Sequence, residues 1–284
     1  MFSMVGYELG LIGHPLEHSM SPAMHHASFE RLGLAYRYGL FDLVSGELED
    51  FISKAKGEMI GVNVTIPHKV SVIPFLDELS KEAELIGAVN TVKFEDGEAR
   101  GFNTDGAGCL MALADAGVNV SGKKLLILGA GGAARAIGFQ ASLDGAKVLL
   151  SNRTEEKQMA LDLAADISSK TGRECHVIDL EPETLAGELR SIDVLVHATP
   201  IGMHPNKDAV IIPPEIIPAN VAVMDIVYNP VQTRLLREAG KRGCKTVDGV
   251  GMLVNQGAAA EKIWLGVDAP VDAMKKVVYE KLSR

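Results

Sequence analysis

Residues 125–134 read Leu-Leu-Ile-Leu-Gly-Ala-Gly-Gly-Ala-Ala, and this stretch decides the fold of the second half of the chain. Residues 125–128 form an unbroken apolar run, which is typical of a parallel strand buried on both faces. The turn that follows has the spacing G-x-G-x-x-A and leads into a helical pattern. Gly129 permits the sharp turn, Gly131 lets the backbone approach a pyrophosphate, and Ala134 lets the helix pack closely on the strand. The stretch therefore predicts a dinucleotide-binding unit.

The helix after this turn gives a second reason to expect a dinucleotide. Its amino end presents unpaired N–H groups and the positive end of the helix dipole, and both suit phosphates. A glycine-rich turn that only saves space is the alternative, but the succession of strand, turn, helix and second strand favours the dinucleotide. The predicted cofactor contacts in the turn are Gly129, Ala130, Gly131, Gly132 and Ala133.

The end of the next strand indicates which dinucleotide binds. An NAD site usually carries Asp or Glu about 20 residues past the turn, where the carboxylate accepts hydrogen bonds from the ribose hydroxyls. Here the predicted strand 147–151 is followed by Asn152, Arg153 and Thr154, and no acid occurs before Glu155. A guanidinium can clamp a 2′-phosphate with paired charge-assisted hydrogen bonds. These three residues predict NADP, and an arginine that merely sits at a helix start is the alternative.

Short apolar runs alternate with helical patterns along most of the chain, which is typical of α/β proteins with parallel sheets. The 284 residues suffice for two modest domains. We predict an N-terminal α/β substrate domain with a mainly parallel sheet, residues 1–108, joined by C-terminal helices over 251–284. The predicted C-terminal NADP-binding Rossmann domain covers residues 109–250.

The predicted elements follow from apolar periodicity and from turn residues. Strands are expected at 6–12, 36–42, 59–65, 124–128, 147–151, 176–179, 194–197, 222–226 and 245–248, with a hairpin at 95–97. Helices are expected from Ser21 as the N-cap residue and at 46–56, 70–75, 80–86, 106–116, 133–144, 155–170 and within 252–284.

Composition narrows the class of partner. The net charge of −9 argues against nucleic acid, because phosphate backbones require a basic face. No run approaches the ~20 apolar residues that cross a bilayer, and the first residues lack the pattern of a signal peptide. The three cysteines are widely spaced, which favours free thiols, and the histidines show no metal-ligand pattern. We expect a cytoplasmic protein with a small-molecule substrate and without membrane, metal or nucleic acid.

Polar residues lie at successive turns of the predicted first domain. Ser19 and Ser21 stand at a strand–helix junction, and two hydroxyls beside helix N–H groups suit a carboxylate. Asn63 and Thr65 share one face near the end of a strand, where ligands of α/β sheets bind, and Lys69 follows just beyond. Such side chains can meet sugar-like hydroxyls.

Each of these residues also has a plain structural explanation. Ser21 can be only a helix cap, and Asp105 can be only the cap of the helix from Gly106. Asn90 and the neighbouring Asn-Thr pairs can be turn formers, and Lys69 can be a surface charge. Their occurrence together favours a site for a small polyhydroxylated acid.

In order along the chain, from Gly13 to about Gly266, these motifs resemble the shikimate dehydrogenase family. The resemblance covers nearly the whole chain, so it is more specific than any single motif. It rests on residues 19–22, 63–69, 87–91, 101–106, 129–136, 152–154, 198–203, 225–230 and 248–256.

The resemblance implies NADPH-dependent, reversible reduction of 3-dehydroshikimate to shikimate in aromatic amino-acid biosynthesis. It implies that Lys69 and Asp105 form the catalytic pair. Carried over by position, the substrate contacts are Ser19, Ser21, Asn63, Thr65, Asn90, Asp105, Tyr228 and Gln256. On the cofactor side it adds Thr199, together with Ile226 and Gly249 near the nicotinamide.

Two other functions are compatible with the same motifs. One is a quinate/shikimate dehydrogenase that uses NAD or NADP, since quinate differs by one hydroxyl near the predicted position of Ser19 and Ser21. The other is a non-catalytic NADP sensor on the same fold, against which the intact Lys69 and Asp105 argue. A homodimer is the candidate assembly.

Overall fold

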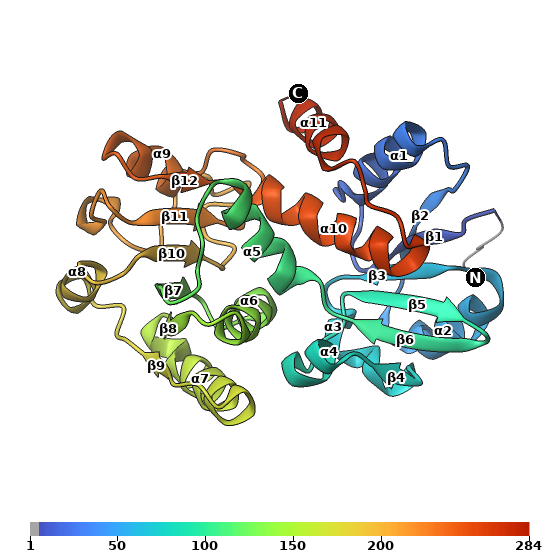
Figure 1. The fold of residues 1–284 in the computed structure, drawn as a ribbon, viewed down its shortest axis with the longest axis horizontal. Coiled ribbons are helices and arrows are strands. Elements are labelled where there is room, and N and C mark those ends of the chain that lie inside the picture. The colour runs from blue at the N-terminus through green and yellow to red at the C-terminus, as the bar shows by residue number, and fades with distance from the viewer. Residues whose placement is uncertain (1–5, 284) are drawn as a thin grey trace. The chain divides into compact units, whose positions relative to one another are not determined.

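The computed structural model describes residues 6–283, so the predicted domain ends at residues 1–5 and 284 lie outside the described residues. The chain divides into two compact units. Unit 1 runs up to Thr104 and resumes at Gln256, and unit 2 covers Asp105–Asn255. The predicted domain bounds at 108/109 and 250/251 fall inside two helices, α5 (Asp105–Asp115) and α10 (Gly249–Leu265). The structure instead divides at the first residue of α5 and within α10 (Figure 1).

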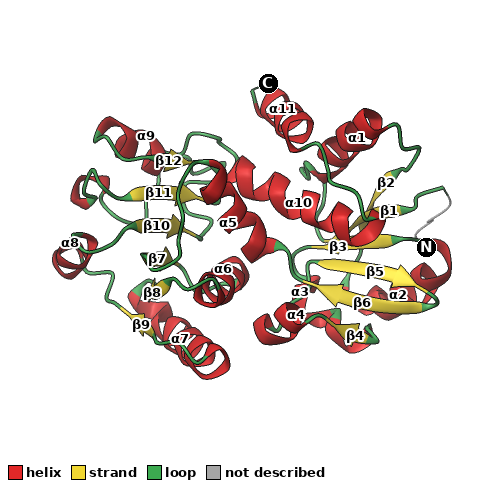
Figure 2. Ribbon diagram, in the orientation of Figure 1, coloured by secondary structure: helices red, strands yellow, loops and turns green. Residues whose placement is uncertain are grey.

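Unit 1 contains a six-stranded sheet with the order β2-β1-β3-β5-β6-β4. Strand β1 pairs parallel with β2 and β3, β4 pairs parallel with β6, and β5 pairs antiparallel with β3 and β6. The turn between β5 and β6 places Asp96 at φ 54° and Gly97 at φ 81°, as in the turns that match the twist of a two-residue hairpin. The strands are β1 (Leu9–Gly13), β2 (Tyr38–Asp42), β3 (Gly61–Val64), β4 (Glu78–Leu79), β5 (Thr91–Glu95) and β6 (Glu98–Phe102) (Figure 2).

Helices cover both faces of this sheet because alternate strand residues point to opposite sides. Leu9 and Leu11 join a core with Phe29 and Trp264, whereas Ile12 joins the core that contains Phe51. The helices of unit 1 are α1 (Ser21–Leu32), α2 (Leu48–Glu58), α3 (His68–Ser71), α4 (Lys81–Ile86), the second part of α10, and α11 (Val271–Leu282), which packs on α1. Short 3₁₀ turns lie at η1 (Ser45–Glu47) and η2 (Ile73–Phe75).

Unit 2 contains a six-stranded sheet, all of whose pairings are parallel, with the order β12-β11-β10-β7-β8-β9. This is the doubly wound order of a Rossmann fold, and its direction reverses between β7 and β10. The predicted fold class is confirmed. The strands are β7 (Lys124–Leu128), β8 (Lys147–Ser151), β9 (Cys175–Val177), β10 (Val194–His197), β11 (Ala222–Asp225) and β12 (Thr246–Val247).

The helices of unit 2 also lie on both faces of its sheet. Leu126 and Leu128 of β7 join the core with α8 and α9, whereas Ile127 lies near Gly138 of α6. The helices are α5, α6 (Gly132–Leu143), α7 (Lys157–Thr171), α8 (Pro182–Leu189), α9 (Arg234–Lys241) and the first part of α10, with 3₁₀ turns η3 (Thr154–Glu156) and η4 (Pro214–Ile216).

Several short elements differ from the predictions. The helix expected at 70–75 is the one-turn α3 followed by η2, because Pro74 lacks the N–H that a continued helix requires. Helices α8 and α9, of eight residues each, and the two-residue β4 were not predicted. In α9 the buried residues Leu235, Leu236 and Ala239 do follow helical spacing, so sequence reasoning overlooked a pattern that was present. Within residues 6–283, no helix is long and apolar enough to span a membrane.

Candidate functional site

The glycine-rich turn after β7 contains two kinds of glycine. Gly129 has φ +117°, and a Cβ there would lie 2.8 Å from the Ala198 carbonyl oxygen, so only glycine fits. At Gly131 and Gly132 a Cβ would meet no described atom within 4 Å. Packing within the chain therefore does not require glycine at these two positions, and their bare backbone leaves room for a ligand.

The amino end of α6 adjoins this open backbone. Gly131 is its N-cap residue, no described side chain caps the helix, and the first turn contains no acidic residue. The N–H groups and the positive end of the helix dipole suit an anion. The turn also lies beside the reversal of strand order between β7 and β10, where ligands of open α/β sheets bind. The residues present therefore fit a dinucleotide pyrophosphate.

A buried polar network at the ends of β10 and β11 holds Thr199. His197 bonds the Thr199 hydroxyl through Nε2 at 2.5 Å and the Asp225 carboxylate through Nδ1 at 2.9 Å. Asp225 also accepts hydrogen bonds from the Thr233 hydroxyl at 2.7 Å and from the Val227 N–H at 3.0 Å. Sequence reasoning missed this network, although His197 and Asp225 end two apolar strands and share one register position.

The predicted 2′-phosphate site follows β8. Asn152 is buried, and its amide accepts a hydrogen bond from the Arg153 N–H at 3.0 Å and donates to the Glu156 carbonyl at 3.2 Å. The exposed Arg153 guanidinium donates to the Glu156 carboxylate. That hydrogen bond lowers the pKa of Glu156. Sequence reasoning considered acids only up to Glu155 and missed Glu156, which lies one turn after Arg153.

Gly249 and Ile226, both predicted near the nicotinamide, lie against each other in unit 2. A Cβ at Gly249 would lie 2.4 Å from the Ile226 carbonyl oxygen, so the start of α10 requires glycine to pack there. Tyr228, predicted to contact the substrate, follows two residues after Ile226. Burial raises the pKa of its hydroxyl.

In unit 1, Asn90 is the centre of a hydrogen-bonded cluster. Its Oδ1 accepts from the Thr104 N–H at 2.8 Å, and its Nδ2 donates to the Thr104 hydroxyl at 2.9 Å and to Gln256 Oε1 at 3.4 Å. Asn63 Nδ2 donates to the Asn90 carbonyl at 3.2 Å and to the Thr91 hydroxyl at 3.1 Å. The structure thus brings together three predicted substrate contacts from β3, α10 and the segment before β5.

At the start of α1 the predicted N-cap role of Ser21 is wrong, whereas substrate contact by Ser19 and Ser21 stays a prediction. Ser21 is the first residue of the helix and not its N-cap residue, which is Met20. The Ser19 hydroxyl accepts the hydrogen bond from the Ser21 N–H at 3.2 Å. Ser21 is buried and its side chain bonds the hydroxyl of Tyr38, which donates to Asn63 Oδ1 at 2.7 Å. Sequence reasoning missed Tyr38.

The two predicted catalytic residues belong to different units. Lys69 is half-buried in α3, and its carbonyl accepts from the Val89 N–H at 2.7 Å, which ties α3 to the segment that leads to Asn90. Thr65 lies just before, and its N–H donates to the Ile12 carbonyl at 2.9 Å. Asp105 is buried at the first position of α5, in unit 2. The role of the pair stays a prediction.

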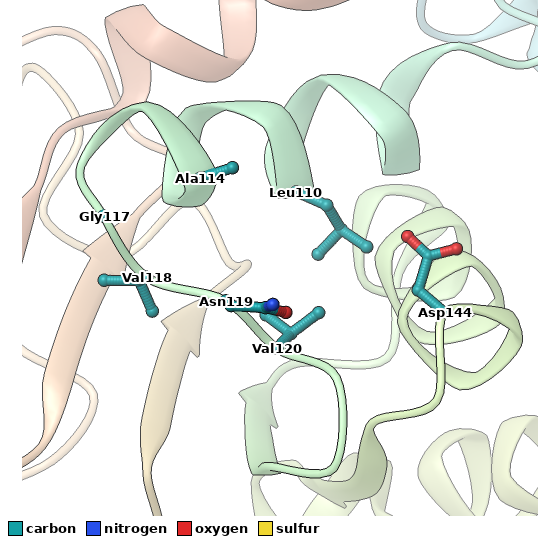
Figure 3. A pocket seen from close by; sticks show the side chains of 7 residues that line it. All are labelled: Leu110, Ala114, Gly117, Val118, Asn119, Val120 and Asp144. Carbon is teal, nitrogen blue, oxygen red and sulfur yellow. The ribbon is translucent and has the colours of Figure 1, made fainter.

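A hollow of about 450 Å³ in unit 2 lies away from these residues. Its lining comes from the end of α5, from the segment before β7 and from the residue after α6, at the amino end of the sheet. The glycine-rich turn is at the carboxyl end, so this hollow is not the predicted cofactor site. The lining residues are Leu110, Ala114, Gly117, Val118, Asn119, Val120 and Asp144 (Figure 3).

Two family models match the chain, one near its N-terminus and one near its C-terminus, and both describe the same family. Residues 11–92 match the shikimate dehydrogenase substrate binding domain, and residues 249–279 match the shikimate 5′-dehydrogenase C-terminal domain. A shikimate dehydrogenase (NADP⁺) of Methanocaldococcus jannaschii is 45% identical over 280 residues, 97% of each chain. One of Methanopyrus kandleri is 48% identical over 282 residues, 96% of this chain and 95% of the relative.

A solved structure is similar along the same length. It is shikimate 5-dehydrogenase from Thermus thermophilus in complex with NADP(H) and shikimate, with a TM-score of 0.86 and 37% sequence identity. The match covers 96% of this chain and 99% of that one. It extends through both units.

Proposed function

The chain belongs to the shikimate dehydrogenase family, and we propose that Lys69 and Asp105 are the residues that carry out its reaction. The protein is an NADP-dependent oxidoreductase that acts on a CH–OH group and reversibly reduces 3-dehydroshikimate to shikimate in the shikimate pathway. The observation that best supports a substrate site is the cluster of Asn63, Asn90 and Gln256. These side chains are distant in sequence and form one hydrogen-bonded group in unit 1.

The two units have different proposed roles, one in binding the substrate and one in binding NADP. Unit 1 is the substrate domain, since it contains the Asn90 cluster, Ser19, Ser21, Thr65 and Lys69. Unit 2 is the NADP-binding domain, since it contains the open glycine-rich turn. Asp105 and Tyr228, the other two proposed substrate contacts, belong to unit 2.

In the reduction, negative charge develops on the ketone oxygen of the substrate. The Lys69 ammonium stabilises that charge and donates the proton that completes the alcohol. Asp105 accepts a hydrogen bond from a neighbouring substrate hydroxyl. In the oxidation, neutral Lys69 removes the proton from the hydroxyl. NADPH, when bound, supplies the hydride.

The chain's own groups account for the cofactor's binding. The backbone of residues 129–133 and the amino end of α6 bind the pyrophosphate. Asn152, Arg153 and Thr154 bind the 2′-phosphate, and Thr199, Ile226 and Gly249 contact the nicotinamide side. The network of His197 with Asp225 fixes the Thr199 hydroxyl in one orientation.

The experiment that tests this function compares two substrate and cofactor pairs with the purified wild-type protein, by absorbance at 340 nm. We expect kcat/KM for shikimate with NADP⁺ to exceed that for quinate with NAD⁺ by about 100-fold, because quinate carries an additional hydroxyl. Equal or better turnover of quinate with NAD⁺ would make the protein a quinate dehydrogenase. Absence of turnover with either pair would favour the non-catalytic sensor.

The pairing of Arg153 with Glu156 leads to a prediction about cofactor affinity. The Glu156 carboxylate competes with the 2′-phosphate for the same guanidinium. Replacing Glu156 with glutamine is expected to lower KM for NADP⁺ about two- to five-fold, a modest effect because the ion pair is exposed. KM for NAD⁺, which lacks the 2′-phosphate, should not change.

The matched control for this measurement is Glu155→Gln. It removes the same charge from the neighbouring residue but leaves the hydrogen bond between Arg153 and Glu156 in place. Equal changes in both variants would contradict a specific competition and would indicate a general charge effect. A parallel decrease of KM for NAD⁺ would also contradict it.

We also propose a cytoplasmic enzyme whose partner is a small molecule rather than nucleic acid. Its three cysteines are buried free thiols, and its net charge of −9 disfavours binding to phosphate backbones. A homodimer is the proposed assembly, for which measuring the mass in solution is the test.

A further inference from the structure

Tyr38, at the start of β2, is buried and joins two predicted substrate contacts. Asn63 Nδ2 faces the Asn90 carbonyl, which can only accept, so the Asn63 Oδ1 faces Tyr38 and receives its O–H at 2.7 Å. The phenol oxygen then accepts a hydrogen bond from Ser21. Burial raises the pKa of Tyr38 well above its ordinary value, so the hydroxyl remains a donor.

The buried His25 ring packs against the Tyr38 ring and restrains it. The His25 ring stacks on it, with 4.3 Å between centroids and 16° between planes. His25 Nδ1 bonds Glu261 Oε1 at 2.7 Å, and the Ser28 hydroxyl donates to Glu261 Oε2 at 2.5 Å. His25 and Glu261 are both fully buried. The phenol therefore has little freedom to turn.

The contacts of Tyr38 connect the elements that carry substrate residues. His25 follows Ser21 by one turn of α1, so the two side chains share a face of that helix. Glu261 is on α10, which also carries Gln256, and Asn63 is on β3. A hydroxyl on Tyr38 thus links α1 to β3, while its ring packs on the pair that links α1 to α10.

We propose that Tyr38 is a positioning residue, whose hydroxyl fixes the side chains of Ser21 and Asn63 in the orientation that binds substrate. The Tyr38 hydroxyl is buried and donates to Asn63, so it acts on the substrate site through that side chain. The inference rests on the proposed function, because it takes Ser21 and Asn63 as part of the substrate site.

The test is Tyr38→Phe, which removes the hydroxyl and keeps the ring that stacks on His25. We expect KM for shikimate to rise about ten-fold, since a buried acceptor on Asn63 loses its donor and Ser21 loses its partner. We expect kcat to stay within about two-fold and KM for NADP⁺ to remain unchanged. The control is Tyr36→Phe, a nearby tyrosine whose ring packs on Phe29, for which all three constants should equal those of the wild type.

A double-mutant cycle with Ser21→Ala distinguishes positioning from a general effect on the fold. If Tyr38 acts through Ser21, the effect of Tyr38→Phe on KM should shrink to about two- to three-fold in the Ser21→Ala background. Full additivity would overturn the inference, and so would an unchanged KM. Parallel changes of kcat and both KM values would overturn it as well. Failure of the wild type to oxidise shikimate would instead overturn the proposed function.

Discussion

Replacing Lys69 with alanine is expected to lower kcat for shikimate oxidation with NADP⁺ by about 10²- to 10⁴-fold, the usual contribution of a positioned acid–base group. The variant loses both the proton acceptor for the substrate hydroxyl and the charge that stabilises the developing oxyanion. KM for NADP⁺ should hardly change, since Lys69 belongs to unit 1 and the predicted cofactor residues belong to unit 2. The measurement is steady-state kinetics followed at 340 nm.

The matched control is Lys81→Ala, which removes an exposed lysine from the start of α4 in the same unit. Its kcat should equal that of the wild type. A near-normal kcat for Lys69→Ala would remove Lys69 from the mechanism. If Lys69 and Asp105 act as one unit, the double variant with Asp105→Asn should lose about as much activity as Lys69→Ala alone.

Replacing Glu261 with leucine is expected to lower the free energy of unfolding of unit 1 by about 3–5 kcal/mol. The substitution leaves the buried His25 Nδ1 and the buried Ser28 hydroxyl without their acceptor. Denaturant unfolding followed by tryptophan fluorescence measures this directly. Trp264 is the only tryptophan of the chain, and its indole N–H donates to the Val92 carbonyl in unit 1, so the signal reports on that unit.

Glu280→Leu is the control for this experiment, because Glu280 is an exposed glutamate on α11 in the same unit. Its effect should stay within about 0.5 kcal/mol. A loss of less than about 1 kcal/mol for Glu261→Leu would mean that water or a new partner satisfies His25. Comparable losses in both variants would mean that the buried pair is not the cause.

The parallel sheet of unit 2 could be predicted from the sequence because its strands carry a strong local signal. The apolar runs at 124–128 and 194–197 give β7 and β10 with the bounds observed. The glycine-rich turn then fixes the connection to α6, and the rules for parallel sheets give the doubly wound order. The two-residue β4 is too short to carry such a signal.

The side-chain networks could not be predicted in the same way. Glu261 bonds His25 across 236 positions of sequence, and nothing near either residue indicates the other. Glu156 lies close to Arg153 in sequence, but whether its carboxylate meets the guanidinium depends on the geometry of η3. The predicted site residues came from the sequence pattern and the family resemblance, whereas the hydrogen-bond partners of those residues, such as Tyr38, come from the structure.

The discontinuity of unit 1 has a consequence for how the protein is made. During synthesis, the residues up to Thr104 emerge from the ribosome first. The whole of unit 2 emerges next, and Gln256 follows it. Unit 2 is one continuous segment and can fold as soon as it is synthesised, as domains generally do. Unit 1 is therefore the first to be synthesised in part and the last to fold completely. Its residues His25 and Ser28 form hydrogen bonds with Glu261, which is synthesised after unit 2. During that interval the face of α1 that contacts α10 and α11 in the folded unit lacks these partners.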